Sequence, residues 1–177
     1  RDLGWQVDVI SLDSSFPFPT QHALGRTRAQ LAAIPDGALT LIDGLALGAM
    51  PDEALAESAR LTLIALVHHP LAAETGLSPE QARRLRDSEA RALRAVRAVI
   101  TTSATTAAAL RADYAVPAAQ LHPIAPGVDR PPSPSAAAAS PPSGQPLQML
   151  CVATLTPRKG HALLLRALAA VQGRSWH

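Results

Sequence analysis

Short apolar runs alternate with helix-like segments along this chain. The runs are continuous rather than alternating in polarity, which is typical of parallel strands buried in a sheet. The predicted strands are Val7–Ile10, Leu39–Ile42, Leu61–Val67, Val96–Thr101, Leu121–Ala125 and Leu147–Val152. The predicted helices are Gln21–Ile34, Pro51–Arg60, Pro79–Ala95, Ala104–Tyr114 and Gly160–Val171. This order predicts an α/β fold, with helices flanking a Rossmann-like, doubly wound parallel sheet.

Local capping signals fix where two of these helices begin. Ser78 precedes Pro79, which fits the first helical turn because it has no N–H to lose, and Gln81 completes a capping box. Ser103 stands directly before an alanine-rich helix, where its hydroxyl most simply serves as the N-cap. We therefore expect both serines to have structural roles.

The predicted elements divide the chain into three parts. Residues 1–129 form an N-terminal Rossmann-like domain, 130–146 a linker rich in Pro, Ser and Ala, and 147–177 the beginning of a C-terminal domain. Residues 1–4 read as a helix end with Gly4 at its C-cap, so we expect the first strand of the domain to be missing. The last thirty or so residues are too few to bury a core alone.

Composition narrows the function classes. The net charge is only +2 and aromatic residues make up 3% of the chain, which argues against nucleic-acid binding. A single cysteine, with no signal peptide and no membrane-length apolar run, predicts a cytoplasmic protein. The chain also lacks the glycine-rich dinucleotide and phosphate-loop motifs, the serine nucleophile elbow and the zinc-protease motif.

The strand-to-helix connection at residues 151–161 is the first candidate site. Arg158 and Lys159 precede a helix N-terminus, whose free N–H groups favour anions, and Lys159 is the only lysine in the chain. Together they suit a diphosphate, because Arg adds a forked donor and Lys a point charge. The alternative is an exposed basic pair without function.

His68 and His69 form the second candidate site, directly after the predicted strand Leu61–Val67. A histidine at a strand carboxyl end can hydrogen-bond a ligand in the cleft of an α/β sheet. Adjacent residues of a strand point to opposite faces, so the pair is poorly placed to bind a metal, and we expect no metal site. A buried histidine with satisfied hydrogen bonds remains an alternative for His68.

Gly127 and Asp129 form the third candidate, after the predicted strand Leu121–Ala125. Gly127 permits a tight turn, and Asp129 could cap that turn or contact a ligand hydroxyl in the cleft. Both interpretations stay open, with the turn favoured.

Three strings in this order resemble the family-4 retaining glycosyltransferases. They are Val67-His68-His69-Pro70-Leu71 with Glu74-Thr75-Gly76-Leu77, then Pro126-Gly127-Val128-Asp129, then Thr156-Pro157-Arg158-Lys159-Gly160. The resemblance implies the N-terminal domain of a GT-B fold, in which two Rossmann-like domains face each other across a cleft. It also implies metal-independent transfer from a UDP- or GDP-linked sugar, with retention, in a bacterial protein.

The resemblance assigns roles to three residues. Arg158 and Lys159 match the basic pair that binds the donor diphosphate, and His68 matches the catalytic-site histidine near the donor sugar. The acceptor stays open, with lipids and polysaccharides as candidates, and a lipid acceptor would place the protein peripherally at the inner face of the cell membrane. No cofactor is expected beyond the donor substrate.

Two features of that family are absent, and one of them is a glycine-containing loop after the first strand of the N-terminal domain. The family's Glu-x7-Glu pattern, which holds the sugar and ribose, does not occur in this sequence, and residues 130–177 contain no Asp or Glu. We therefore expect this stretch of sequence to be a fragment that is inactive alone. The alternatives are a non-catalytic truncated Rossmann-like protein or interaction module, and an epimerase or phosphorylase of the same architecture.

Overall fold

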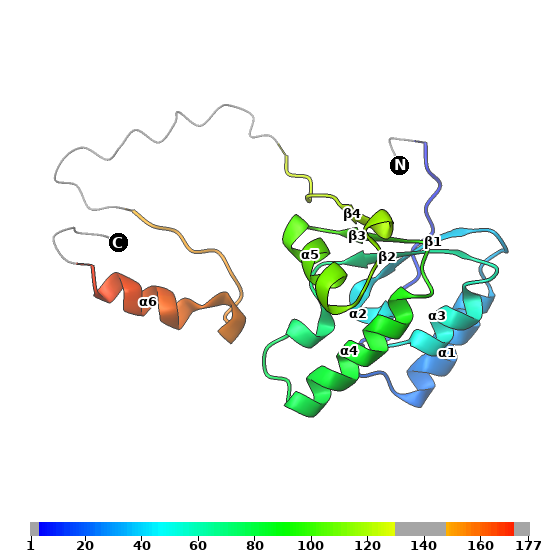
Figure 1. Ribbon diagram of the computed structural model, residues 1–177, viewed down its shortest axis with the longest axis horizontal. Coiled ribbons are helices and arrows are strands. Elements are labelled where there is room, and N and C mark those ends of the chain that lie inside the picture. Colours follow the sequence, from blue (N-terminus) through cyan, green and yellow to red (C-terminus); the bar gives the residue numbers. More distant parts are fainter. Residues whose placement is uncertain (1–3, 130–147, 172–177) are drawn as a thin grey trace. The chain divides into compact units, whose positions relative to one another are not determined.

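The computed structural model describes residues 4–129 and 148–171, and its two compact units comprise residues 1–126 and 127–177 (Figure 1). The first unit is a parallel sheet with helices, and the second contains a short 3₁₀ turn and one helix. The predicted helix end at residues 1–3 lies outside the described residues.

Four parallel strands form the sheet of the first unit, in the order β1-β2-β3-β4. They are β1 (Leu39–Asp43), β2 (Thr62–Val67), β3 (Ala98–Thr101) and β4 (Leu121–Pro123). The register places Ile42, Ala65 and Val99 in one row across the first three strands. Because all strands run the same way, their carboxyl ends meet at one edge of the sheet.

Helices connect the strands and cover one face of the sheet, with α1, α3 and α4 beneath it (Figure 1). The helices are α1 (Gln21–Ala32), α2 (Gly44–Leu47), α3 (Pro51–Glu57), α4 (Pro79–Leu93) and α5 (Ala104–Asp113), with 3₁₀ turns η1 (Leu71–Ala73) and η2 (Ala118–Gln120). The predicted α/β fold with a Rossmann-like parallel sheet flanked by helices is confirmed.

The core lies between this face and the helices. Leu63, Val67 and Val99 of the sheet are at most 1% exposed and pack in one cluster with Leu110 of α5. On the opposite face, Leu39 and Leu41 of β1 are more than half exposed. Right-handed crossovers that always move in the same direction place every helix between two strands on the same side of the sheet. The described sheet is therefore wound in one direction only, since its strand order never reverses, and the doubly wound arrangement expected from the sequence is wrong for these strands.

The start of α4 confirms the predicted capping box. The Ser78 hydroxyl accepts from the Gln81 N–H at 3.2 Å, and the Gln81 side chain accepts from the Ser78 N–H at 2.8 Å. Ser103 caps α5 in the same way, accepting from the Thr106 N–H at 3.0 Å. These bonds satisfy amide groups that have no partner inside a helix.

A Ser78→Ala substitution is expected to lower the free energy of unfolding by about 1 kcal/mol, because it removes the N-cap acceptor. Urea denaturation of the two proteins measures this difference. Ser78→Thr, which keeps a hydroxyl at the cap, should retain most of the stability. Equal losses in the two variants would contradict the capping role.

The predicted strand Val7–Ile10 is wrong. Residues 5–13 form no strand, and Val9 is 87% exposed. The segment contacts α1 through a hydrogen bond, which the Gln30 side chain donates to the Ser11 carbonyl at 3.2 Å. A strand needs a neighbour for its ladder of hydrogen bonds, and within the described residues no strand pairs with this segment. An apolar run alone therefore does not predict a strand.

The second unit contains η3 (Pro157–Lys159) and α6 (His161–Ala169), which confirms the predicted helix in this region. The predicted strand Leu147–Val152 is wrong for residues 148–152, which form no strand, and Leu147 lies outside the described residues. Leu150 and Leu155 are about nine-tenths exposed. No described residue of this unit is buried, since one segment and one helix cannot enclose a core.

Candidate functional site

The carboxyl edge of the sheet brings His68 next to an acidic residue of the neighbouring strand. His68 follows β2, and Asp43 is the last residue of β1. The His68 Nε2 atom lies 3.4 Å from Asp43 Oδ2, and both side chains are more than half exposed. Asp43 is itself held by its other oxygen, which accepts from the Leu45 N–H at 2.9 Å and caps α2. A carboxylate in this position orients the imidazole and leaves Nδ1 available to a ligand.

The backbone of His68 is held from the other side by α5 and the loop before it. Its carbonyl accepts from the Thr106 hydroxyl at 3.1 Å and from the Thr102 hydroxyl at 3.3 Å. Thr106 is buried and belongs to the first turn of α5. The histidine is therefore positioned by three strand ends, those of β1, β2 and β3.

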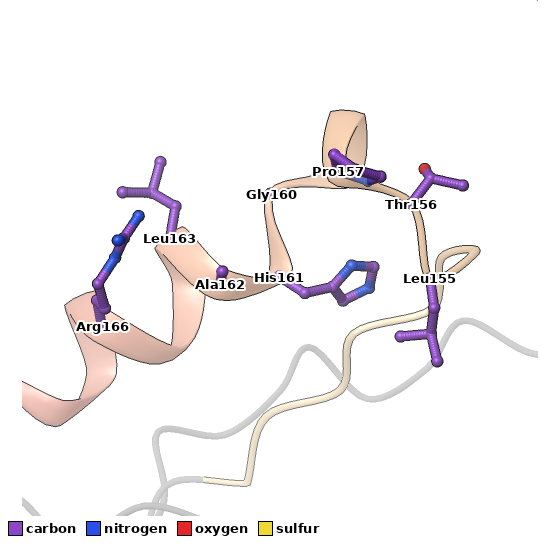
Figure 2. A pocket seen from close by; sticks show the side chains of 8 residues that line it. All are labelled: Leu155, Thr156, Pro157, Gly160, His161, Ala162, Leu163 and Arg166. Carbon is purple, nitrogen blue, oxygen red and sulfur yellow. The ribbon is translucent and has the colours of Figure 1, made fainter. Parts of the chain in front are cut away.

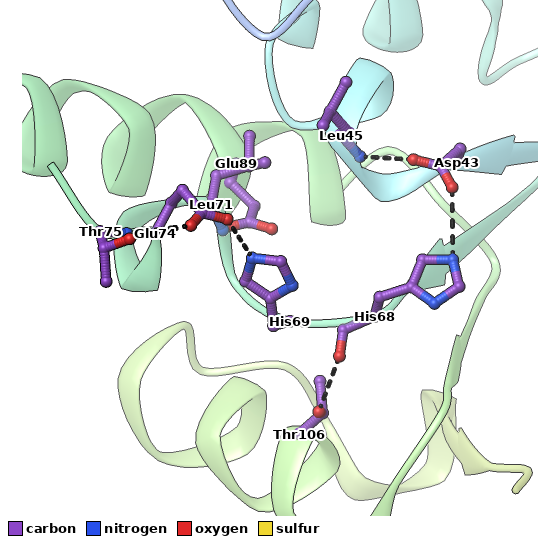
Figure 3. Close-up of polar contacts among 9 residues, drawn as sticks. All are labelled: Asp43, Leu45, His68, His69, Leu71, Glu74, Thr75, Glu89 and Thr106. Carbon is purple, nitrogen blue, oxygen red and sulfur yellow. Dashed lines mark hydrogen bonds and ion pairs between the residues drawn. The ribbon is translucent and has the colours of Figure 1, made fainter. Parts of the chain in front are cut away.

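His69 points away from His68 and has a different partner (Figure 3). Its Nε2 atom lies 2.9 Å from Glu74 Oε2, and Glu74 also accepts from the Thr75 N–H at 3.1 Å. The two rings diverge, as expected for adjacent residues. Within residues 4–129 and 148–171, no three His, Cys, Asp or Glu side chains converge in a way that could hold a metal ion.

A buried carboxyl lies behind this loop. Glu89 of α4 is 1% exposed, and its Oε2 atom accepts from the Leu71 N–H at 2.9 Å (Figure 3). Burial raises the pKa of the Glu89 carboxyl from its ordinary value of 4.5 to about 7, although the Leu71 N–H and the Tyr114 hydroxyl partly oppose the shift. Burial also raises the pKa of Tyr114, and the Glu89 charge adds to that effect. Neither Glu89 Oε1 nor the Tyr114 hydroxyl has a hydrogen bond of normal geometry among the described residues.

Gly127 and Asp129 lie in an extended, exposed segment of the second unit. Residues 124–129 contain no turn, and the φ angle of Gly127 is not in the left-handed region. The turn expected here is therefore wrong. A glycine at this position is not required by the backbone, because a Cβ atom would have open space around it.

Arg158 and Lys159 lie in η3, immediately before α6, and both are exposed. Gly160 follows with a φ of 70°, a left-handed conformation that glycine adopts without strain, and this turns the chain into the helix. No side chain caps α6 in the described residues. Its first N–H groups are therefore available to an anion near the basic pair.

A shallow, open cavity of about 510 Å³ lies at the same turn (Figure 2). The His161 ring points from the start of α6 toward Leu155, and Arg166 lies further along the helix beside Leu163. Arg158 and Lys159 do not line this cavity. Its lining residues are Leu155, Thr156, Pro157, Gly160, His161, Ala162, Leu163 and Arg166.

Sequence reasoning missed Asp43, Thr106 and Glu89. Asp43 directly follows the predicted strand Leu39–Ile42, so the rule that placed His68 at a strand end also applied to it. Thr106 and Glu89 lie within helices, and their partners are 38 and 18 residues away in the sequence. No local pattern predicts such pairings.

Residues 43–130 match the family model described as Glycosyltransferase Family 4, about half of the chain. The matched segment contains Asp43, His68, Glu89 and Thr106, and therefore the whole carboxyl edge described above. No curated protein and no solved structure gives a significant match. In the described part of the chain, no helix is both long and apolar enough to cross a membrane.

Proposed function

Because this chain belongs to glycosyltransferase family 4, we propose that it serves the transfer of a sugar from a nucleoside-diphosphate sugar to an acceptor, with retention at the anomeric carbon. The observation that carries the proposal is the family match, which covers the complete polar edge of the sheet from Asp43 to Thr106. Ligands of parallel α/β sheets bind outside the carboxyl ends of the strands, which is where this edge lies.

His68 is the residue of this unit that we assign to the donor sugar. Its ring is exposed, it is oriented by Asp43 at 3.4 Å, and its backbone is fixed by two threonine hydroxyls. With Nε2 facing the carboxylate, the Nδ1 atom of the imidazole is left to hydrogen-bond a sugar hydroxyl. Pre-organisation of this kind limits the entropy lost when the substrate binds.

Arg158 and Lys159 are the residues that we assign to the donor diphosphate. As the bond to the anomeric carbon breaks, negative charge grows on the leaving diphosphate, and fixed cations stabilise that charge. The uncapped start of α6 adds N–H donors of the same polarity. Under this proposal the cations do the work that a metal does in other enzymes, and no metal is needed.

The base of the proposed donor nucleotide is uracil or guanine, and the acceptor is a lipid, a polysaccharide or a small molecule. A lipid acceptor would bring the protein to the inner face of the cell membrane, whereas the other acceptors keep it in the cytoplasm.

Calorimetric titration of the chain with UDP and with GDP tests the diphosphate site. Saturable binding of one nucleotide is expected, and Lys159→Ala should weaken it by about tenfold to a hundredfold, the worth of one charge-assisted hydrogen bond of about 1.5–3 kcal/mol. Binding should also weaken with added salt, because the cations are exposed.

Arg97→Ala is the matched control, since it removes one exposed cation before β3, at the opposite edge of the sheet from His68. This variant should bind like the wild type. If the folded wild type binds neither nucleotide, the diphosphate assignment is wrong. Equal affinities of the wild type and Lys159→Ala would show that Lys159 does not contact the nucleotide, although the chain would still have a nucleotide-binding site.

A further inference from the structure

Glu89 is an ionisable residue buried in the core, where few hydrogen-bond donors among the described residues contact its carboxyl group. A buried carboxyl without full hydrogen bonding is costly, and a helix residue facing the core is usually apolar. Its Oε2 atom has one partner, the Leu71 N–H at 2.9 Å, and Oε1 has none of normal geometry among the described residues.

Its hydrogen bond to the backbone goes to the loop that carries both histidines. Leu71 begins η1 and is only three residues after His68, with His69 and Pro70 between them. Figure 3 shows Glu89 behind this loop, on the side away from Asp43. The loop is thus held at two points: by threonine hydroxyls at the His68 carbonyl and by a carboxyl at the Leu71 amide.

Glu89 packs closely against Gly48 and Leu71. A Cβ atom on Gly48 would lie 3.2 Å from both Cβ and Cγ of Glu89 and 2.7 Å from Leu71 Cδ1. The neighbouring Ser88 hydroxyl donates to the Gly48 carbonyl at 2.7 Å, which fixes the same stretch of α4 against the segment after α2. Glu89 therefore lies where α4, the segment after α2 and the histidine loop meet.

We propose that Glu89 is a positioning residue for the His68–His69 loop, which it holds through the Leu71 amide more firmly when ionised than when protonated. A charged carboxylate accepts a shorter and stronger hydrogen bond than a neutral carboxyl group does. Deprotonation therefore tightens the loop, and protonation loosens it. The inference rests on the proposed function only in giving that loop a substrate.

Few other ionisable groups face Glu89. Tyr114 directly follows α5. Its ring lies 5.5 Å from the Arg86 guanidinium of α4, and the Asp113 charge adds to the rise of its pKa. On the loop, His69 and Glu74 pair with each other at 2.9 Å. Residues 44–50, the segment that contains Gly48, include no ionisable side chain. Glu89 is therefore the group whose titration should dominate the environment of the Leu71 amide.

Nuclear magnetic resonance of the full chain without nucleotide tests the proposal between pH 5 and 8.5. The Leu71 amide shift should follow one inflection close to pH 7, where Glu89 titrates. Residual dipolar couplings of the His68, His69 and Leu71 amides should change over the same range. In Glu89→Gln the inflection at Leu71 should be lost and the couplings should stay constant. Asp87→Asn, an exposed carboxyl on the same helix, should behave like the wild type.

A wild-type Leu71 amide without this inflection would overturn the proposal, and that result needs no variant to fold. Persistence of the inflection in Glu89→Gln would overturn it as well. A second titration, with UDP-glucose or GDP-mannose present, separates the proposal from the function: His68 ring signals that ignore both donors would contradict the donor-sugar assignment. The positioning role of Glu89 would then stand without that substrate.

Discussion

Between pH 5 and pH 8, the wild type is expected to lose about 2–3 kcal/mol of unfolding free energy relative to Glu89→Gln. The folded-state pKa of Glu89, about 7, lies above its ordinary value of 4.5 because the carboxyl is buried. The folded state therefore binds this proton more tightly than the unfolded state, so the stabilisation is complete below about pH 4.5 and is lost as the pH rises through 7. At about 1.4 kcal/mol per pKa unit, the full effect is about 3 kcal/mol. Urea denaturation of both proteins at several pH values measures it.

The comparison with glutamine isolates Glu89, because the two proteins differ at this position alone. The His68–Asp43 and His69–Glu74 pairs are present in both proteins and therefore do not contribute to the difference. Asp87→Asn again provides the control, because an exposed carboxyl on α4 should leave the pH dependence unchanged. Parallel stability curves for the wild type and Glu89→Gln would show that Glu89 is not buried as described.

Stability and loop order should thus respond to pH in opposite directions. Ionised Glu89 lowers the stability of the whole unit, because a charge is buried, yet it binds the Leu71 amide more strongly. Functional sites often combine a local gain with a global cost of this kind. An apolar residue at position 89 would avoid the destabilisation by a buried charge, but it would also remove the hydrogen bond to the Leu71 amide. The positioning role therefore explains why a carboxyl is kept at this position.

Local signals predicted the helices better than the strands. The capping residues Ser78 and Ser103 fixed the starts of α4 and α5, because a cap acts over only three residues. The apolar runs also identified β1 to β4, each of which has a neighbour in the sheet. The segments at 7–10 and 148–152 carry the same apolar signal without forming strands, since pairing depends on distant residues.

The site could be predicted only in part, for a related reason. His68 could be placed because parallel strands bring their carboxyl ends to one edge, and the structure puts it there. Glu89 stands among Arg83, Arg84 and Asp87, so one more charged residue does not stand out in this part of the sequence. Its spacing from buried residues was the overlooked signal: Leu85, Glu89 and Leu93 follow one another at intervals of four and share the buried stripe of α4.

The largest loss of stability is expected for Leu110→Ala, at about 2–5 kcal/mol. Leu110 is 0% exposed and lies on α5, the helix whose first turn supplies the Thr106 hydroxyl to the His68 carbonyl. The substitution removes buried methyl groups and leaves a cavity between α5 and the sheet. Because domains are stable by only about 5–15 kcal/mol, such a loss would be visible as a large shift of the urea midpoint.

Leu39→Ala is the matched substitution on the opposite face of the sheet. Leu39 is 56% exposed on β1, so the same change should cost well under half as much as at Leu110. Similar losses at the two positions would mean that the outer face of β1 is covered in solution, contrary to the arrangement described. A small loss at Leu110 would instead indicate that α5 does not pack against the core as described. The contact between Thr106 and the His68 carbonyl would then be in doubt as well.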